Sequence, residues 1–257
     1  MSSKPLVAVL RGELVKAWTV RSTGWCVLLT FLVSIGLGLV DSWSVRAAIA
    51  RHSPLVRSDF DPADAGFVGI SYGQVCLVVF AVLFMASEYT TGSIRSSLAA
   101  VPRRGLFLAG KLLALTVIAF AVSLTAALTS FAASERELGP MAVPLGSDGV
   151  PRAILGAAGY VTLVCVLSAA VAGLLRSSAM ALGTLIPFYL VIPTIISTIP
   201  GVRAAANYLP DQAGAQAMQI AKQGTSTLTP VSGMLVLAAW TACAVLSGYV
   251  SLRVRDA

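Results

Sequence analysis

The chain has 257 residues, of which 57% are apolar and only 11% are charged, and its formal net charge is +7. A soluble globular domain carries about a quarter charged residues, so this composition excludes an ordinary soluble domain and predicts an all-α integral membrane protein. The positive charge would also suit a nucleic-acid partner, but its distribution follows membrane topology, and no nucleic-acid partner is expected.

The first 22 residues (1–22) precede the first apolar run and have an amphipathic pattern. Their apolar stripe consists of Leu6, Val9, Leu10, Leu14 and Trp18. This spacing predicts a helix that lies along the membrane surface. Glu13 falls within the stripe, which is unusual for a surface helix. Either it pairs with a base such as Lys16, or it faces a partner protein.

Six later segments are apolar and long enough to cross a bilayer, which takes about 20 residues. The predicted spans are 23–40, 67–87, 112–133, 153–175, 179–199 and 231–250. Six spans place both termini on one side. The four cysteines fall in different apolar runs, as Cys26, Cys76, Cys165 and Cys243. Without a paired spacing or a cluster with histidine, they predict neither a disulfide nor a metal site.

The charges between the spans give the orientation, because cytoplasmic loops are enriched in lysine and arginine. With both termini inside, the inner segments carry 11 basic and 3 acidic residues, and the outer segments carry 7 basic and 8 acidic residues. This asymmetry predicts a multi-pass protein of the plasma membrane with N-in, C-in topology.

The only substantial inner loop is Glu88–Lys111, and the segment 88–105 makes up most of it. Ile94, Leu98 and Val101 would share one face of a helix, and Pro102 would end it. One interpretation is a basic turn that holds two spans at the membrane surface. The other is a docking element for a cytoplasmic protein. The residues alone leave both open.

Several spans contain polar residues or prolines. The polar positions singled out are Thr30, Ser34, Ser71, Tyr72 and Gln74. Such residues allow close helix packing, or they line a transport route. Pro187 and Pro193 predict a kink in span five, because each removes a helical hydrogen bond. The segment 200–230 is predicted to be an outer loop.

Two motifs resemble those of a known family. The first is Glu88-Tyr89-x-x-Gly92-Ser93-Ile94-Arg95-x-x-Leu98, followed by Val101-Pro102-Arg103-Arg104 and by Lys111. The second is Gly12-Glu13-Leu14-x-Lys16, followed by Val20-Arg21-Ser22-Thr23. Together with the six-span layout, they are similar to the permease subunits of ABC-2 type exporters, particularly the actinobacterial group.

The resemblance implies a type V exporter-like fold. The loop would hold a coupling helix that fits a separate ATP-binding subunit, with the contact residues Glu88, Tyr89, Gly92, Ser93, Ile94, Arg95, Leu98, Pro102 and Arg103. The N-terminal connecting helix would contribute Glu13, Lys16, Trp18 and Arg21. Two ATPase subunits and a second permease copy, identical or related, would complete the assembly. The route would follow spans one, two and five, and short helices within 200–230 would dip into the outer leaflet.

The sequence contains no Gly-x-x-x-x-Gly-Lys-[Ser/Thr] loop, so no enzyme activity and no cofactor is expected on this chain; ATP and Mg²⁺ would bind the partner ATPase. The expected function is export of a hydrophobic or amphipathic substrate. A non-transporting scaffold or sensor is an alternative, and so is an ion-coupled secondary transporter. The latter is disfavoured because the middle of each span lacks ionisable residues.

Overall fold

A computed structural model describes residues 4–51, 62–93, 104–199, 203–220 and 228–255. Within these ranges every regular element is a helix, and six of the helices are long and apolar enough to cross a membrane. The predicted all-α class, with six apolar helices of membrane-spanning length, is therefore confirmed. The elements are α1 (Lys4–Thr19), α2 (Arg21–Ala50), α3 (Pro62–Thr90), α5 (Arg104–Leu138), η1 (Gly139–Met141), α6 (Val150–Leu175), α7 (Ser178–Leu190), α8 (Ile192–Thr198), α9 (Arg203–Ala206), α10 (Pro210–Ala215), η2 (Gln216–Met218) and α11 (Pro230–Arg255).

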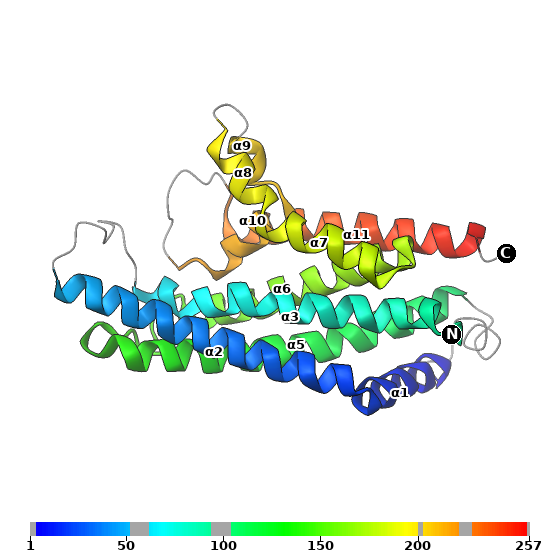
Figure 1. Cartoon of the computed structure of the whole chain (residues 1–257), viewed down its shortest axis with the longest axis horizontal. Helices are drawn as coiled ribbons and strands as arrows, with labels where there is room; N and C mark the ends of the chain where they lie inside the picture. Colours follow the sequence, from blue (N-terminus) through cyan, green and yellow to red (C-terminus); the bar gives the residue numbers. More distant parts are fainter. Residues whose placement is uncertain (1–3, 52–61, 94–103, 200–202, 221–227, 256–257) are drawn as a thin grey trace.

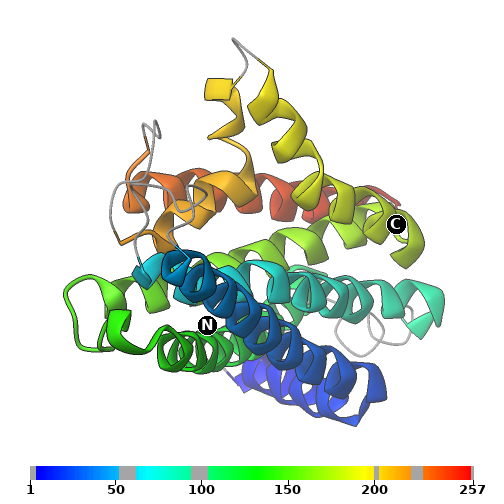
Figure 2. The same ribbon diagram turned by 60° about the vertical axis from the view of Figure 1, so that its left-hand side comes forward.

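The helices α2, α3, α5 and α6 form a bundle in which consecutive helices run antiparallel, and α11 packs against α6 (Figure 1). The helix α1 and the last turns of α11 lie at the same end of the bundle, here called the terminal end. The opposite end, which carries η1 and the start of α6, is called the far end. Figure 2 shows that α7 and α8 tilt away from the bundle.

The closest helix contact joins α2 to α3 through small residues. A side chain at Gly69 or Gly73 would collide with Ser34 of α2, so only hydrogen fits at these positions. The hydroxyl of Ser130 on α5 donates to the backbone carbonyl of Ser34 at 3.0 Å. Close approach through small and hydroxyl residues is how membrane helices associate in the absence of a hydrophobic driving force.

The helices extend beyond the predicted spans at both ends of the bundle. The helix α2 continues to Ala50, where Arg46 reaches α5 and donates to the carbonyl of Glu137 at 3.0 Å. The helix α5 begins at Arg104, so Lys111 lies two turns inside a helix that was expected to begin at Leu112. Arg104 donates to the carbonyl oxygen of Leu252 at 2.8 Å, near the end of α11. Contacts with neighbouring helices stabilise these added turns. The length of an apolar run does not predict such contacts.

Span five is interrupted at Val191, between its two prolines. The helix α7 contains Pro187 and ends at Leu190, and Pro193 stands in the first turn of α8. Because proline has no N–H, the carbonyl of Tyr189 lacks the helical donor that residue 193 would otherwise supply. The span is therefore built from two helical pieces.

Candidate functional site

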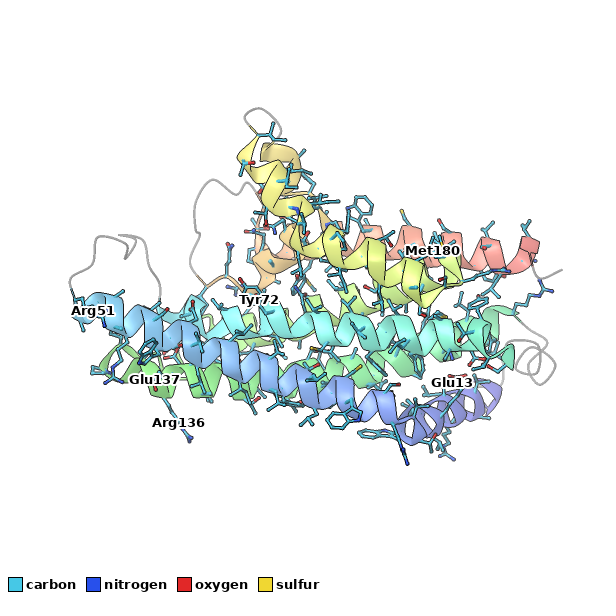
Figure 3. All side chains as sticks on the ribbon, viewed as in Figure 1. Glu13, Arg51, Tyr72, Arg136, Glu137 and Met180 are labelled. Atoms are coloured by element: carbon cyan, nitrogen blue, oxygen red, sulfur yellow. The ribbon has the colours of Figure 1, made fainter. Side chains whose placement is uncertain are left out.

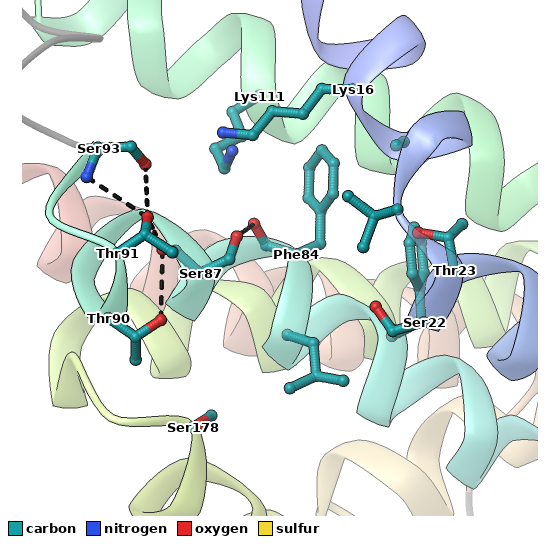
Figure 4. Close-up of a pocket in the computed structure, with 14 residues that line it drawn as sticks. Lys16, Ser22, Thr23, Phe84, Ser87, Thr90, Thr91, Ser93, Lys111 and Ser178 are labelled. Atoms are coloured by element: carbon teal, nitrogen blue, oxygen red, sulfur yellow. Dashed lines mark hydrogen bonds between the residues drawn. The ribbon is translucent and has the colours of Figure 1, made fainter.

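Four charged side chains meet at the terminal end of the bundle, and they are called here the ionic cluster: Glu13, Lys16, Glu88 and Lys111. The ammonium of Lys111 donates to Oε2 of Glu13 and to Oε1 of Glu88, each at 2.9 Å. Lys16 also donates to Oε1 of Glu88. The cluster joins α1, the last turn of α3 and the second turn of α5, and Figure 4 shows the two lysine ammonium groups side by side.

Burial separates the members of this cluster. Lys111 has no exposed surface, Glu88 is 1% exposed and Glu13 is 8% exposed, whereas the side chain of Lys16 is 41% exposed. A charge so deeply buried costs several kcal/mol unless it is paired and hydrogen-bonded. Pairing with two carboxylates meets that requirement for Lys111.

Aromatic rings complete the surroundings of Lys111. Its ammonium lies 4.5 Å from the centroid of the Phe84 ring and 5.9 Å from that of Phe107. These distances are within the range of cation–π attraction. The aromatic rings and carboxylates together fix the position of one ammonium between three helices.

The position of Glu13 agrees with one of the two expectations for it. It pairs with a base, but the base is Lys111 and not Lys16. Figure 3 shows Glu13 on the side of α1 that faces the bundle. The side of α1 that packs against the core contains Leu10, Glu13, Leu14 and Ala17. Trp18 is 73% exposed and points away from this side, whereas Arg21, which was expected in the same helix, is exposed at the start of α2.

The cluster also fixes the end of α3. The hydroxyl of Ser93 donates to Oε2 of Glu88 at 2.7 Å. Gly92 has a φ of +69°, a left-handed conformation that favours glycine and ends a helix. Tyr89 lies under the guanidinium of Arg176, 5.4 Å from its ring centroid, so the turn between α6 and α7 also contacts this end.

Of the predicted docking residues, four are described and the remainder lie outside the described residues. The described ones are Glu88, Tyr89, Gly92 and Ser93. The others are Ile94, Arg95, Leu98, Pro102 and Arg103. Both described flanks of the segment 94–103 are therefore tied to the ionic cluster, by Ser93 before it and by Lys111 two turns after it.

A cleft of about 510 Å³ opens beside the cluster, between α1, α2, α3 and the start of α7 (Figure 4). Its walls combine aromatic and aliphatic side chains with a rim of hydroxyls. The lining residues include Phe80, Leu83, Phe84, Ser87, Thr90 and Thr91. Such a mixture suits a molecule that has both an apolar body and a polar group.

The predicted pathway residues do not gather in this cleft. Thr30 and Ser34 are fully buried at the contact of α2 with α3 and α5. The hydroxyl of Ser71 donates to the carbonyl of Phe67 on its own helix at 3.1 Å. Tyr72 is 52% exposed, and Gln74 is buried in the bundle. Pro187 and Pro193 flank the break in span five.

Lys111 belongs to the first motif but was not predicted to be a site residue, and neither Phe84 nor Phe107 was singled out. The signal in the sequence was Glu13, an acid within an apolar stripe, because a buried carboxylate requires a basic partner. The structure shows that the partner lies 98 residues away along the chain.

Comparison with known proteins adds no relative. No protein-family model matches the chain, and a search of curated proteins finds no significant match.

Proposed function

We propose that this chain is the membrane-spanning permease subunit of an ABC-2 type exporter, with N-in, C-in topology in the plasma membrane and a type V exporter-like fold. A separate ATPase, expected in two copies, would bind ATP and Mg²⁺, and a second permease copy would complete the substrate route. The observation that carries the proposal is the ionic cluster, which ties both flanks of the segment 94–103 to the transmembrane helices.

The cluster supports the proposal because it makes a mechanical connection. A partner that moves the segment 94–103 would pull on the end of α3 through Ser93 and Glu88, and on the start of α5 through Lys111. Movement passes between sites through packed and hydrogen-bonded groups that have discrete arrangements. Glu13 and Lys16 would draw α1 into the same movement.

The cleft beside the cluster supports a hydrophobic or amphipathic substrate. It is bounded by apolar side chains with hydroxyls at its edge, and it lies where α2, α3 and α7 meet, which are spans one, two and five. Lys16 and Lys111 of the ionic cluster also line the cleft.

The test is purification of the tagged full-length chain in mild detergent, followed by mass spectrometry of what is bound and an ATPase assay. The expected result is a stoichiometric ATP-binding partner with ATP turnover. A partner without ATPase activity would favour the scaffold or sensor, and a chain with no partner that moves substrate on an ion gradient would favour the secondary transporter.

A matched pair of variants connects the test to the cluster. Glu88→Gln removes the carboxylate that holds both lysines, and we expect the partner to stay bound while substrate no longer stimulates its turnover. Glu137→Gln makes the same change at the far end and should leave coupling intact. Unchanged stimulation in Glu88→Gln would contradict the assignment of the cluster.

A further inference from the structure

After α9 the described part of the chain, 207–220, returns to the bundle. The helix α10 and η2 pack against α6 and α11 (Figure 1). Glycines make this contact possible, because a side chain at Gly214 would collide with Tyr160 of α6, and one at Gly233 of α11 would collide with the backbone of Ala213. The segment 210–218 thus packs closely between α6 and α11, in a position called here its seat.

Asp211 is enclosed by this seat. It is 4% exposed, and its Oδ1 has no hydrogen-bond partner. Its Oδ2 accepts one hydrogen bond, from Nε2 of Gln212 at 3.0 Å. Within the described part of the chain no basic side chain forms an ion pair with it, in contrast to the paired carboxylates of the ionic cluster. Burial disfavours an ionised carboxylate here, and the backbone hydrogen bonds of Asp211 and Gln212 in the first turn of α10 offset only part of that cost.

Among the described residues no basic side chain compensates the charge of Asp211, and Arg152 of α6 donates instead to the carbonyl oxygen of Gln219 at 2.7 Å. Tyr160 of α6 and Tyr189 of α7 are the titratable groups that interact electrostatically with Asp211, and Cys165 of α6 interacts in the same way with both tyrosines. The described residues of α11 and η2 that pack against α10 bring no titratable group. Gln74 of α3, which also interacts with Tyr160, is 8% exposed, and its Oε1 has no hydrogen-bond partner. Two buried acceptor oxygens therefore lack a donor.

We propose that Asp211 is a proton-binding site, and that its protonation holds the segment 210–218 in its seat between α6 and α11. A proton is the one cation that needs no additional room, and it turns the unpaired Oδ1 into a donor. Loss of the proton leaves a buried charge, and the segment then moves out of the seat. The proposal does not depend on the ATP-driven function.

The direction of the pH dependence follows from burial. Burial raises the pKa of the Asp211 carboxyl from 3.8 to about 6. Below about pH 4 the carboxyl is protonated whether or not the segment is seated. The equilibrium constant for seating therefore has its highest value there. Between about pH 4 and pH 6 only the seated form keeps the proton, so seating weakens as the pH rises. Above about pH 6 the equilibrium constant for seating is about 100-fold lower than below about pH 4.

Hydrogen–deuterium exchange of the full chain in lipid nanodiscs tests the proposal. Protection of the amides in 213–219, corrected for the pH dependence of intrinsic exchange, should fall between about pH 4 and pH 6 and then level off. The indole of Trp240 gives a second readout, because its Nε1 donates to the carbonyl of Tyr208 at 3.1 Å. In a variant whose other tryptophans are replaced by phenylalanine, its emission should change over the same pH range.

Two variants complete the experiment. Asp211→Asn is neutral at every pH, so its segment should stay protected throughout. Asp148→Asn removes an exposed acid at the far end and should behave as the wild type. Protection in the wild type that does not vary with pH would overturn the proposal, whether or not Asp211→Asn folds. So would protection at pH 8 that rises with added methylammonium, because an amine would then be the occupant.

Discussion

Lys111 and Lys16 bind the same oxygen of Glu88 but differ in their exposure to solvent. Lys111 is enclosed by two carboxylates and two aromatic rings, whereas Lys16 is 41% exposed and interacts with the outer side of the cluster. Removal of one partner from a buried pair leaves an uncompensated charge, while removal of an exposed partner leaves water to replace it. The two lysines should therefore differ in their effect on stability.

We expect Lys111→Met to lower the free energy of unfolding by about 3–5 kcal/mol, because Glu13 loses its only ion-pair partner among the described residues and Glu88 loses its buried one. Lys16→Met should lower it by about 0–1 kcal/mol, since Glu88 keeps Lys111. Denaturant unfolding of the purified variants in detergent measures both values.

The carboxylates provide the control for this comparison. Replacing both Glu13 and Glu88 by glutamine in the Lys111→Met background removes the uncompensated charges, and part of the lost stability should return. Equal losses in the two lysine variants, or no recovery in the triple variant, would show that the cluster does not act as a buried ionic network.

The contact between α2 and α3 shows how element packing depends on single hydrogen atoms. Gly69 approaches the backbone carbonyl of Ser34 so closely that an added methyl group has nowhere to go, whereas Gly36 of α2 has no neighbour within 4 Å of the position that a methyl group would occupy. The two glycines thus form a matched pair, one at a helix contact and one at an open position.

Gly69→Ala should lower the free energy of unfolding by about 1–3 kcal/mol, because the two helices must separate or bend to admit the methyl group. Gly36→Ala should leave stability unchanged or raise it by up to about 1 kcal/mol, as alanine favours a helix over glycine. Thermal unfolding in the same detergent compares them. A Gly69→Ala variant as stable as the wild type would mean that α2 and α3 are not in this close contact.

The sequence predicts the helices better than it predicts their contacts. Apolar runs of about 20 residues place all six membrane helices, because a bilayer imposes that length on any crossing helix. Lys111 was placed in a loop by its charge, and its helical position depends on Glu13 and Glu88, which are distant along the chain. Asp211 was likewise counted with the outer charges.

Sequence periodicity also gave an incomplete view of α1. The apolar stripe that ends in Trp18 predicts one buried side, but the buried residues include Glu13 and Ala17 while Trp18 is exposed. Tryptophan is favoured at the membrane–water interface, where its ring can remain outside the protein core. A single sequence does not show whether an apolar residue faces lipid or protein.

At the scale of the whole molecule, the two ends of the bundle carry different charges. The terminal end has Lys16, Arg104, Arg176 and Arg253, and its two described acids are held in the ionic cluster. The far end carries a nearly balanced set of basic and acidic residues, including Arg46 and Glu137. The positive-inside rule therefore predicts that the terminal end faces the cytoplasm.

Two open glycines allow a direct test of this orientation. Gly12 of α1 and Gly146 in the turn before α6 are both exposed, and a side chain at either would meet no atom within 4 Å. Each is changed to cysteine in a chain whose four native cysteines are replaced by alanine. A membrane-impermeant maleimide applied to intact cells should label Gly146→Cys and leave Gly12→Cys unlabelled, and lysis should expose both. The reverse pattern would place the segment 94–103 outside the cell, where no ATP-hydrolysing partner could reach it, and the proposed exporter function would then be wrong.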